Sequence, residues 1–429
     1  MRENGNDIQP KEDPWDFLAS KLRNHPMAWE PRDFDTSLDS TASAASYVID
    51  LDDRGVVEVE QALSFFKGCG LYGDEVSRES FPLPTLEAKL DAACRDIHDG
   101  RGFVVLRGLD PQRYSKEDNI NIYLGVAAYI GDIRGIQNKK GDMLGKFFIR
   151  FIPSPVPGHL DLLEHITDSP DWSSVKPEMR IGIHTNQSLA WHTDTSTDIL
   201  ALYVLGVGTA GGDTLIASSW TICRELATFS PEVLEVLMSD CWRVQLSKTS
   251  NKHVLGPILQ AHNGKIFLNI DVDLIGDALE PLQRQALDTV FALASKHSLR
   301  LSKKPGDMIF INNHSLLHAR DKYIDPDVVQ GHRRHLVRMW LRNSRLGWDI
   351  PASIRPHWEN VFGPRGDGYP TFILDRTRRS RACGLIERQC SVTPARHYLA
   401  PLYATPSSSA AFMDYCGEAK ETQHDPEDR

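Results

Sequence analysis

The residues most suited to chemistry in this sequence are His192 and Asp194, within the segment Ser188–Asp198 (SLAWHTDTSTD). Side chains two positions apart on a β-strand lie on the same face, so these two would project together while Thr193 points away. An imidazole nitrogen and a carboxylate oxygen placed side by side can bind one metal ion. A third donor must come from a distant segment, and His318, in NNHSLLHAR, is the candidate.

Two histidines and one carboxylate, with open positions for other ligands, are typical of non-haem Fe(II) oxygenases. A His-x-Asp pair also arises by chance, and the 16 histidines offer other partners. His314 lies close to His318 and competes with it, and His184, His332 and His335 are further candidates. The same ligands could serve a hydrolase or isomerase with another metal, or persist in a β-sandwich that only binds.

Two arginines offer the cation that a buried carboxylate needs. The run His332–Arg342 (HRRHLVRMWLR) spaces Arg334 and Arg338 so that both lie on one face of an expected strand. A planar guanidinium pairs with a carboxylate through two parallel hydrogen bonds. A basic run is also compatible with a solvated surface, and we expect Trp340, like Trp191, to belong to the core.

The composition is that of a soluble globular protein, with 41% hydrophobic and 25% charged residues among 429. The net charge of -10 argues against a nucleic-acid partner. The 7 cysteines are scattered without a C-x-x-C pair, which favours reduced thiols. We see neither a secretory signal nor an apolar run of about 18 residues that could span a membrane, so we expect a cytoplasmic protein with no membrane partner. A homodimer is compatible with all of this.

Apolar periodicity predicts the elements that must position these residues. Helices are predicted at 58–66, 85–98, 116–130, 219–240 (broken at Ser230-Pro231) and 279–297. Short strands are predicted at 103–107, 199–207, 214–218, 241–246, 266–270, 299–301, 308–311 and 336–341. Regularly spaced strands separated by glycine turns indicate a sandwich or barrel.

The chain is expected to form a single domain over 46–403, with a helical N-terminal part and a C-terminal extension. Residues 1–45 are polar and predict a flexible N-terminal arm onto which Trp29 could dock. Residues 404–429 predict a disordered tail, and the polar segment 153–180 predicts a lid.

Three segments together resemble one family. WHTDTSTDILALYVLGVGTAGGDTLIAS, PGDMIFINNHSLLHAR and HRRHLVRMWLRN are similar to the TauD/TfdA (taurine dioxygenase) family of Fe(II)- and 2-oxoglutarate-dependent dioxygenases. The resemblance extends over about residues 100–345. It implies a mainly β fold with flanking helices, built on a double-stranded β-helix, or jelly-roll, core. It also implies Fe(II), O2 and 2-oxoglutarate as cofactor and co-substrates, with release of succinate and CO2.

The resemblance assigns roles to individual residues. His192, Asp194 and His318 fall on the iron ligands, which are also the catalytic residues. Thr214, in GGDT, and Arg334 fall on the positions that bind the distal carboxylate of 2-oxoglutarate, although Arg333 and Arg338 stay open as alternatives to Arg334. Arg338 falls on a second arginine, which contacts the substrate in sulfonate-using relatives. Independently of the resemblance, Asn186 and Ser188 directly precede the metal pair and could line the substrate pocket or take ordinary loop roles.

The arm and the extension GWDIPASIRPHWENVFG are similar to fungal members of natural-product pathways. This implies a small, amino-acid-like or anionic substrate and hydroxylation, desaturation or an oxidative cyclisation such as aziridine formation. The alternative is a catabolic hydroxylase of a sulfonate or carboxylate.

Overall fold

The longest apolar strands form a 7-stranded sheet in the order β1-β2-β14-β6-β17-β3, with β4 paired to β17. These strands are β1 (Val48–Asp50), β2 (Phe103–Arg107), β3 (Ile133–Arg134), β4 (His165–Ile166), β6 (Ile199–Gly206), β14 (Met308–Asn312) and β17 (His335–Arg342). In β2, Val104 and Leu106 pack on one side while Phe103 and Val105 pack on the other. Both faces of the sheet are therefore covered, which is why its central strands are apolar at consecutive positions.

The computed structural model describes residues 22–34, 47–71, 73–136, 165–166, 185–194, 197–246, 251–276, 278–325 and 333–363. All of them belong to one unit of the chain, Met1–Thr377. In this part of the chain no helix is long and apolar enough to cross a membrane.

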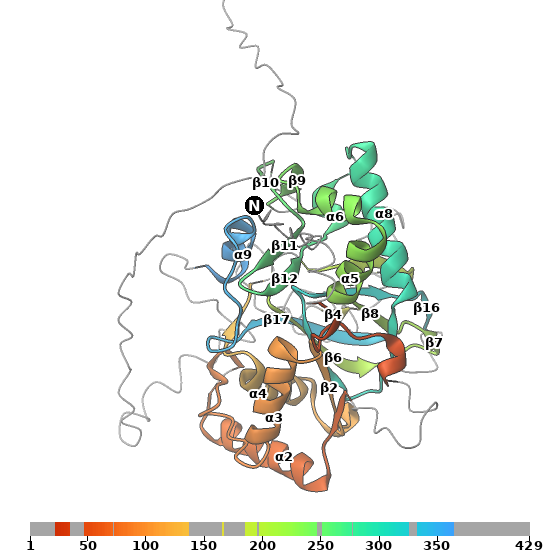
Figure 1. Ribbon diagram of the computed structural model, residues 1–429. Coiled ribbons are helices and arrows are strands. Elements are labelled where there is room, and N and C mark those ends of the chain that lie inside the picture. Colours follow the sequence, from red (N-terminus) through yellow and green to blue (C-terminus); the bar gives the residue numbers. More distant parts are fainter. Residues whose placement is uncertain are drawn as a thin grey trace, which may run out of the picture. The chain divides into compact units, whose positions relative to one another are not determined.

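Helices α2 (Asp53–Gly68), α3 (Glu87–Asp99) and α4 (Lys116–Ile130) cover the outer face of the large sheet (Figure 1). Asp52 and Ser115 cap the first and the last of them by accepting hydrogen bonds from the amides of Gly55 and Asp118. Short 3-10 helices lie at Pro31–Phe34, Gly73–Glu75 and Pro111–Arg113.

A 4-stranded sheet, in the order β13-β8-β15-β5, faces the inner side of the large one. Its strands are β5 (Leu189–His192), β8 (Thr214–Ser218), β13 (Leu299–Leu301) and β15 (Leu316–Arg320). Apolar side chains of both sheets form the core between them: from β6 Leu200, Leu202 and Val204, and from the small sheet Ile216, Leu301 and Leu316. Two facing, mostly antiparallel sheets with flanking helices confirm the predicted jelly-roll core.

A second helical layer packs on the far side of the small sheet (Figure 1). It contains α5 (Ser219–Phe229), α6 (Pro231–Met238) and α8 (Pro281–Lys296). The short α7 (Val272–Ile275) and α9 (Arg355–Phe362), which lies apart from these three helices in Figure 1, add side chains to the same hydrophobic cluster. Ser218 caps α5, and Pro231 begins α6 at the predicted break. The remaining strands form two-stranded ladders: β9 (Trp242–Gln245) with β10 (His253–Gly256), β11 (Leu259–His262) with β12 (Lys265–Leu268), and β7 (Ala210–Gly211) with β16 (Tyr323–Ile324).

Part of the predicted flexible arm is packed onto the body. Within residues 22–34, Trp29 is buried against Phe103 and donates its indole hydrogen to the carbonyl oxygen of Arg101 at 2.8 Å. Met27 is fully buried, and its carbonyl oxygen accepts from Ser218. The rest of 1–45, the predicted lid over 153–180 apart from β4, and the predicted tail over 404–429 lie outside the described residues.

Candidate metal and carboxylate sites

His192, Asp194 and His318 converge on one point, as the sequence predicts. β5 and β15 pair with His192 directly opposite His318, and the two imidazole centroids lie 4.1 Å apart. Asp194 Oδ1 is 3.8 Å from Nε2 of His192 and 3.8 Å from Nε2 of His318. All three donor atoms lie within 4.8 Å of one another. Metal–ligand bonds of about 2.1 Å separate neighbouring donors by roughly 3–4 Å, so this cluster fits one ion.

The protonation states also suit a metal. Burial would raise the pKa of Asp194, but Arg338, His318, His192 and the Trp340 indole together lower it to about 2. Burial and the neighbouring His192 lower the pKa of His318 to about 3. At neutral pH the carboxylate is therefore ionised and this imidazole neutral, which are the forms that bind metals.

The backbone fixes the orientation of His192. Its Nδ1 lies 2.7 Å from the carbonyl oxygen of Ala190. A carbonyl can only accept, so Nδ1 carries a hydrogen, and Nε2 is the nitrogen that faces the cluster.

The two oxygens of Asp194 have different partners. Oδ1 faces the histidines, whereas Oδ2 accepts from the Trp340 indole at 2.6 Å and from Arg338 at 3.2 Å; Arg338 reaches Oδ1 only at 3.5 Å. Trp340, expected to be a core residue, thus has a polar partner at the centre of the site. Its position two residues after Arg338 on β17 places both on one face.

Asn313, which follows β14, holds the backbone around Asp194. Its Oδ1 accepts from the Asp194 amide at 2.8 Å, and its Nδ2 donates to the carbonyls of Asp194 at 2.6 Å and Thr197 at 2.9 Å. On the other side Thr193 exchanges hydrogen bonds with the backbone of Ile270, so its side chain points away from the cluster as predicted. The sequence contains the Asn313 signal, an asparagine pair directly after an apolar strand, but we did not assign it a role.

His314, a candidate metal ligand in the sequence, contacts Asp198 instead of the metal cluster. Its Nε2 lies 3.3 Å from Asp198, whose carboxylate also accepts from Trp358 at 2.8 Å and pairs with Arg342 at 2.5 Å. This buried network ties α9 to the strands. His335 is not part of the metal cluster either, and His184 and His332 lie outside the described residues.

Thr214 begins β8 opposite Arg320 in the ladder, and Arg334 packs against Gly212 in the turn that leads into this strand. Arg334 is 3% exposed, its Nε lies 3.4 Å from the carbonyl oxygen of Gly212, and its guanidinium is 4.9 Å from the Tyr323 ring centre. Its Nη1 has no hydrogen-bond partner among the described residues. Burial, reinforced by Arg320, lowers the pKa of Arg334 to about 10. A buried guanidinium with an unused donor fits an incoming carboxylate.

Two glycines make room for this arrangement. Gly211 and Gly212 have φ of 72° and 77°, in the left-handed region that glycine tolerates. A Cβ on Gly211 would lie 2.2 Å from the carbonyl oxygen of Lys322, and one on Gly212 would lie 3.0 Å from the Arg334 side chain. Glycine is therefore required at both positions: at 211 because the turn packs against the backbone of Lys322, and at 212 because the Arg334 side chain occupies the space of a Cβ.

The other predicted site residues take different positions. Arg338 is partly buried beside Asp194, and its guanidinium lies 5.0 Å from the centre of the Trp340 ring. Ser188 is exposed and Asn186 partly so at the entrance to β5. The carbonyl oxygen of Asn186 accepts from the Tyr323 amide at 3.0 Å. Arg333, the alternative to Arg334 in the sequence, is only partly buried.

A jelly-roll core that places a two-histidine, one-carboxylate cluster near a buried arginine defines the class of non-haem iron oxygenases that use 2-oxoglutarate. Residues 66–340 match the family described as "Taurine catabolism dioxygenase TauD, TfdA family". The chain is 33% identical over 362 residues to a taurine hydroxylase-like protein, SAT17, of Stachybotrys chartarum, covering 80% of this chain and 86% of that protein. It is 26% identical over 331 residues to FR-33289 synthase of Streptomyces rubellomurinus, covering 74% and 90%.

Solved structures share the fold. Asparagine oxygenase, in complex with Fe(II), 3-hydroxyasparagine and succinate, superposes with a TM-score of 0.54 at 16% identity, covering 70% of this chain and 98% of that one. The non-haem iron oxygenase OrfP, with Fe, succinate and a hydroxyarginine, gives 0.51 at 17% identity, covering 69% and 94%. This chain belongs to the TauD/TfdA family, and it is a non-haem Fe(II)- and 2-oxoglutarate-dependent oxygenase.

Proposed function

We propose that His192, Asp194 and His318 hold the iron, and that Thr214 and Arg334 bind the distal carboxylate of 2-oxoglutarate. The observation that carries this proposal is the convergence of the three donors on one point, with Asp194 ionised and His318 neutral at neutral pH. The unused Nη1 of Arg334 supports the second half, because a buried cation needs an anionic partner.

When bound, the iron and 2-oxoglutarate supply the oxidation of a C–H bond with O2, leaving succinate and CO2. The protein contributes position and surroundings. β5 and β15 hold the two histidines side by side, and Asn313 holds the backbone of Asp194 next to them. Trp340 and Arg338 keep one oxygen of Asp194 occupied, and the apolar core between the sheets limits access of water.

For the substrate we propose a small, amino-acid-like or anionic molecule of a natural-product pathway. Arg338 is the residue proposed to face it, because its guanidinium lies beside the metal cluster; Asn186 and Ser188 are proposed to contribute from the entrance to β5. FR-33289 synthase is named for making a particular product, and the two neighbours of known structure hold hydroxylated amino acids. Hydroxylation, desaturation and oxidative cyclisation are all open to this site.

A second candidate is a catabolic hydroxylase of a sulfonate. The name of the relative from Stachybotrys chartarum, a taurine hydroxylase-like protein, favours it. The guanidinium of Arg338 could donate hydrogen bonds to the oxygens of either a sulfonate or a carboxylate.

The metal assignment is tested by replacing each donor with alanine. We expect His192→Ala, Asp194→Ala and His318→Ala to lose tight Fe(II) binding and 2-oxoglutarate turnover, because each removes a direct ligand. Competition with a coloured chelator measures the affinity. His314→Gln is the matched control, because that histidine serves Asp198, and it should bind Fe(II) as the native chain does. Native affinity in any of the three alanine variants would refute the assignment.

Substrate class is tested by measuring succinate release with Fe(II), O2 and 2-oxoglutarate against a panel of amino acids, taurine and other small acids. Stimulation by an amino acid supports the first proposal, and stimulation by taurine alone supports the second. If no member raises release above the background without substrate, the small anionic class is wrong.

A further inference from the structure

Lys303 lies in the loop after β13 and points into the carboxylate site. Its Nζ donates to the carbonyl oxygen of Gly212 at 2.5 Å and to Thr214 Oγ1 at 3.1 Å. Neither the sequence pattern nor the family resemblance assigned it a role. Burial, reinforced by Arg334, disfavours the charged form and lowers the pKa of Lys303 well below its ordinary value, whereas an anion bound beside this side chain would favour its ammonium form.

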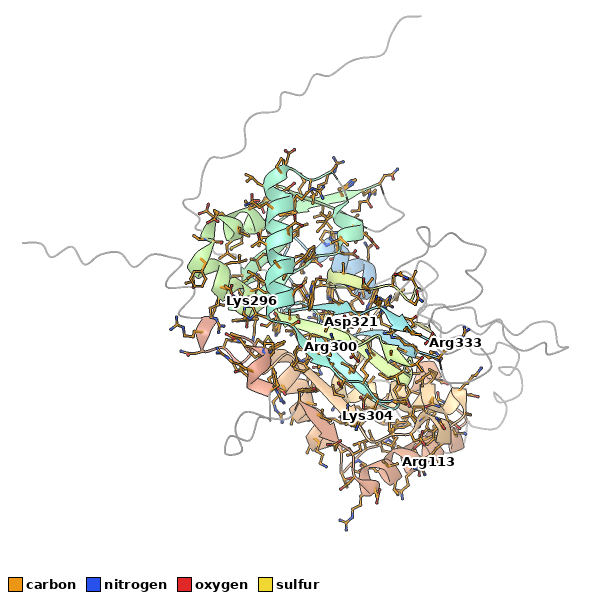
Figure 2. The ribbon with its side chains drawn as sticks, turned by 90° about the vertical axis from the view of Figure 1, so that its right-hand side faces the viewer. Arg113, Lys296, Arg300, Lys304, Asp321 and Arg333 are labelled. Carbon is orange, nitrogen blue, oxygen red and sulfur yellow. The ribbon has the colours of Figure 1, made fainter. Side chains whose placement is uncertain are left out.

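The surrounding charges leave this lysine without a counter-ion. Asp213 and Asp321, the carboxylates whose charge acts on Lys303, both pair with Arg300, which is half exposed; Figure 2 shows Arg300 and Asp321 side by side. Asp325 accepts from the backbone amide of Arg334 at 2.8 Å. In the part of the chain that the structure describes, neither Lys303 nor Arg334 forms an ion pair with a carboxylate. Two buried cations without an anion are unfavourable unless a ligand supplies one.

The hydrogen bond from Lys303 also determines which way the Thr214 hydroxyl hydrogen can point. A hydroxyl carries one hydrogen, and an ammonium can only donate. When Lys303 donates to Thr214 Oγ1, the hydroxyl hydrogen must point elsewhere and is available to an incoming carboxylate. Of the three hydrogens of the ammonium, two are used within the described residues, and the third can reach the same anion.

We propose that Lys303 is a positioning residue for the distal carboxylate of the co-substrate: it turns the Thr214 hydroxyl toward that carboxylate and adds a second positive charge beside Arg334. The proposal rests on the assignment of this site to 2-oxoglutarate. With Lys303, three groups favour binding of a dicarboxylic 2-oxo acid over a monocarboxylic one. Two of them, Thr214 and Arg334, follow from the family resemblance, and Lys303 does not.

The test is the affinity of the anaerobic Fe(II)-loaded full chain for two ligands, measured by titration calorimetry. One is 2-oxoglutarate, and the other is 2-oxopentanoate, in which a methyl group replaces the distal carboxylate. Lys303→Met should weaken 2-oxoglutarate about tenfold or more, the loss typical of a charge-assisted hydrogen bond. It should leave 2-oxopentanoate unchanged, because that ligand has nothing for Lys303 to act on.

Controls separate the possible failures. Lys304→Met, at the exposed neighbouring lysine labelled in Figure 2, should bind both ligands as the native chain does. Lys303→Gln keeps an N–H donor without the charge and replaces the Met variant if that one does not fold. Equal weakening of both ligands would mean that Lys303 only holds the Gly212 turn, and unchanged 2-oxoglutarate affinity would also overturn the proposal.

The route through Thr214 has its own readout. In a Thr214→Val chain, Lys303→Met should cost less affinity for 2-oxoglutarate than it does in the native chain, because the hydroxyl it orients is gone. An undiminished cost would overturn the positioning role. If the native Fe(II)-loaded chain binds no 2-oxoglutarate while Fe(II) itself binds, the proposed co-substrate site fails instead, which is a different result from any above.

Discussion

The two oxygens of the Asp194 carboxylate have different surroundings. One oxygen faces His192 and His318, and the other accepts from Trp340 and Arg338. Because the second oxygen is occupied, the carboxylate is suited to bind a metal through one atom, which leaves coordination positions open. The same donors keep the carboxylate ionised despite complete burial.

Trp340→Phe isolates the contribution of the indole hydrogen bond. We expect about tenfold weaker Fe(II) binding, since partners of a metal ligand commonly contribute 10–100-fold to metal affinity. Chelator competition measures it. Trp191→Phe is the control, because that tryptophan donates to Ser295 at 2.9 Å, away from the cluster. Equal effects of the two replacements would mean that Trp340 matters only for packing.

At the scale of elements, local pattern predicted the large sheet well and the small one only in part. β2, β6 and β14 are apolar on both faces, so their sequence signal is strong, and the helices α4 and α8 follow from apolar spacing. The pairing of β5 with β15 joins segments far apart in the chain, and no local signal encodes it. The partners of Trp340 and Lys303 were missed for the same reason, because their significance depends on which strands become neighbours.

Asn313 shows how one element positions another. β5 ends before Asp194, so the ligand sits on a short connection that β14 must hold through this side chain. Asn313→Ala would leave a buried amide and two buried carbonyls without partners. At about 1–3 kcal/mol for each unsatisfied group, we expect a loss of about 3 kcal/mol or more in the free energy of unfolding.

Urea unfolding measures that loss, and chelator competition should show weaker Fe(II) binding in the same variant. Asn313→Asp provides a graded comparison, because it keeps the acceptor for the Asp194 amide but loses the donor to the carbonyls. Native stability and native metal affinity in the Ala variant would show that the strand ladder alone positions Asp194.

On the scale of the whole molecule, the burial of histidines between layers couples stability to pH. In the metal-free chain the pKa of His318 is lowered to about 3 by burial and His192, and that of His335 to about 4 by burial, Lys116 and Arg334. The unfolded chain has ordinary histidine pKa values near 6.5. Both side chains therefore take up protons more readily when the chain unfolds.

The stability of the metal-free protein should thus be level above pH 6.5 and fall as the pH drops toward about 4. Each of the two histidines contributes a slope of up to about 1.4 kcal/mol per pH unit. Asp194, with its pKa near 2, stays ionised in the folded chain, but its carboxyl has an ordinary pKa of 3.8 in the unfolded chain, so it adds a smaller slope of the same sign at the acid end of this window. Urea unfolding measures the free energy of unfolding at each pH. His335→Asn should reduce the slope of that free energy against pH by the contribution of one histidine. Saturating Mn(II) should oppose the acid loss as long as the metal outcompetes protons at His318. A flat profile between these pH values, or the same slope after His335→Asn, would show that neither imidazole is held neutral by the fold.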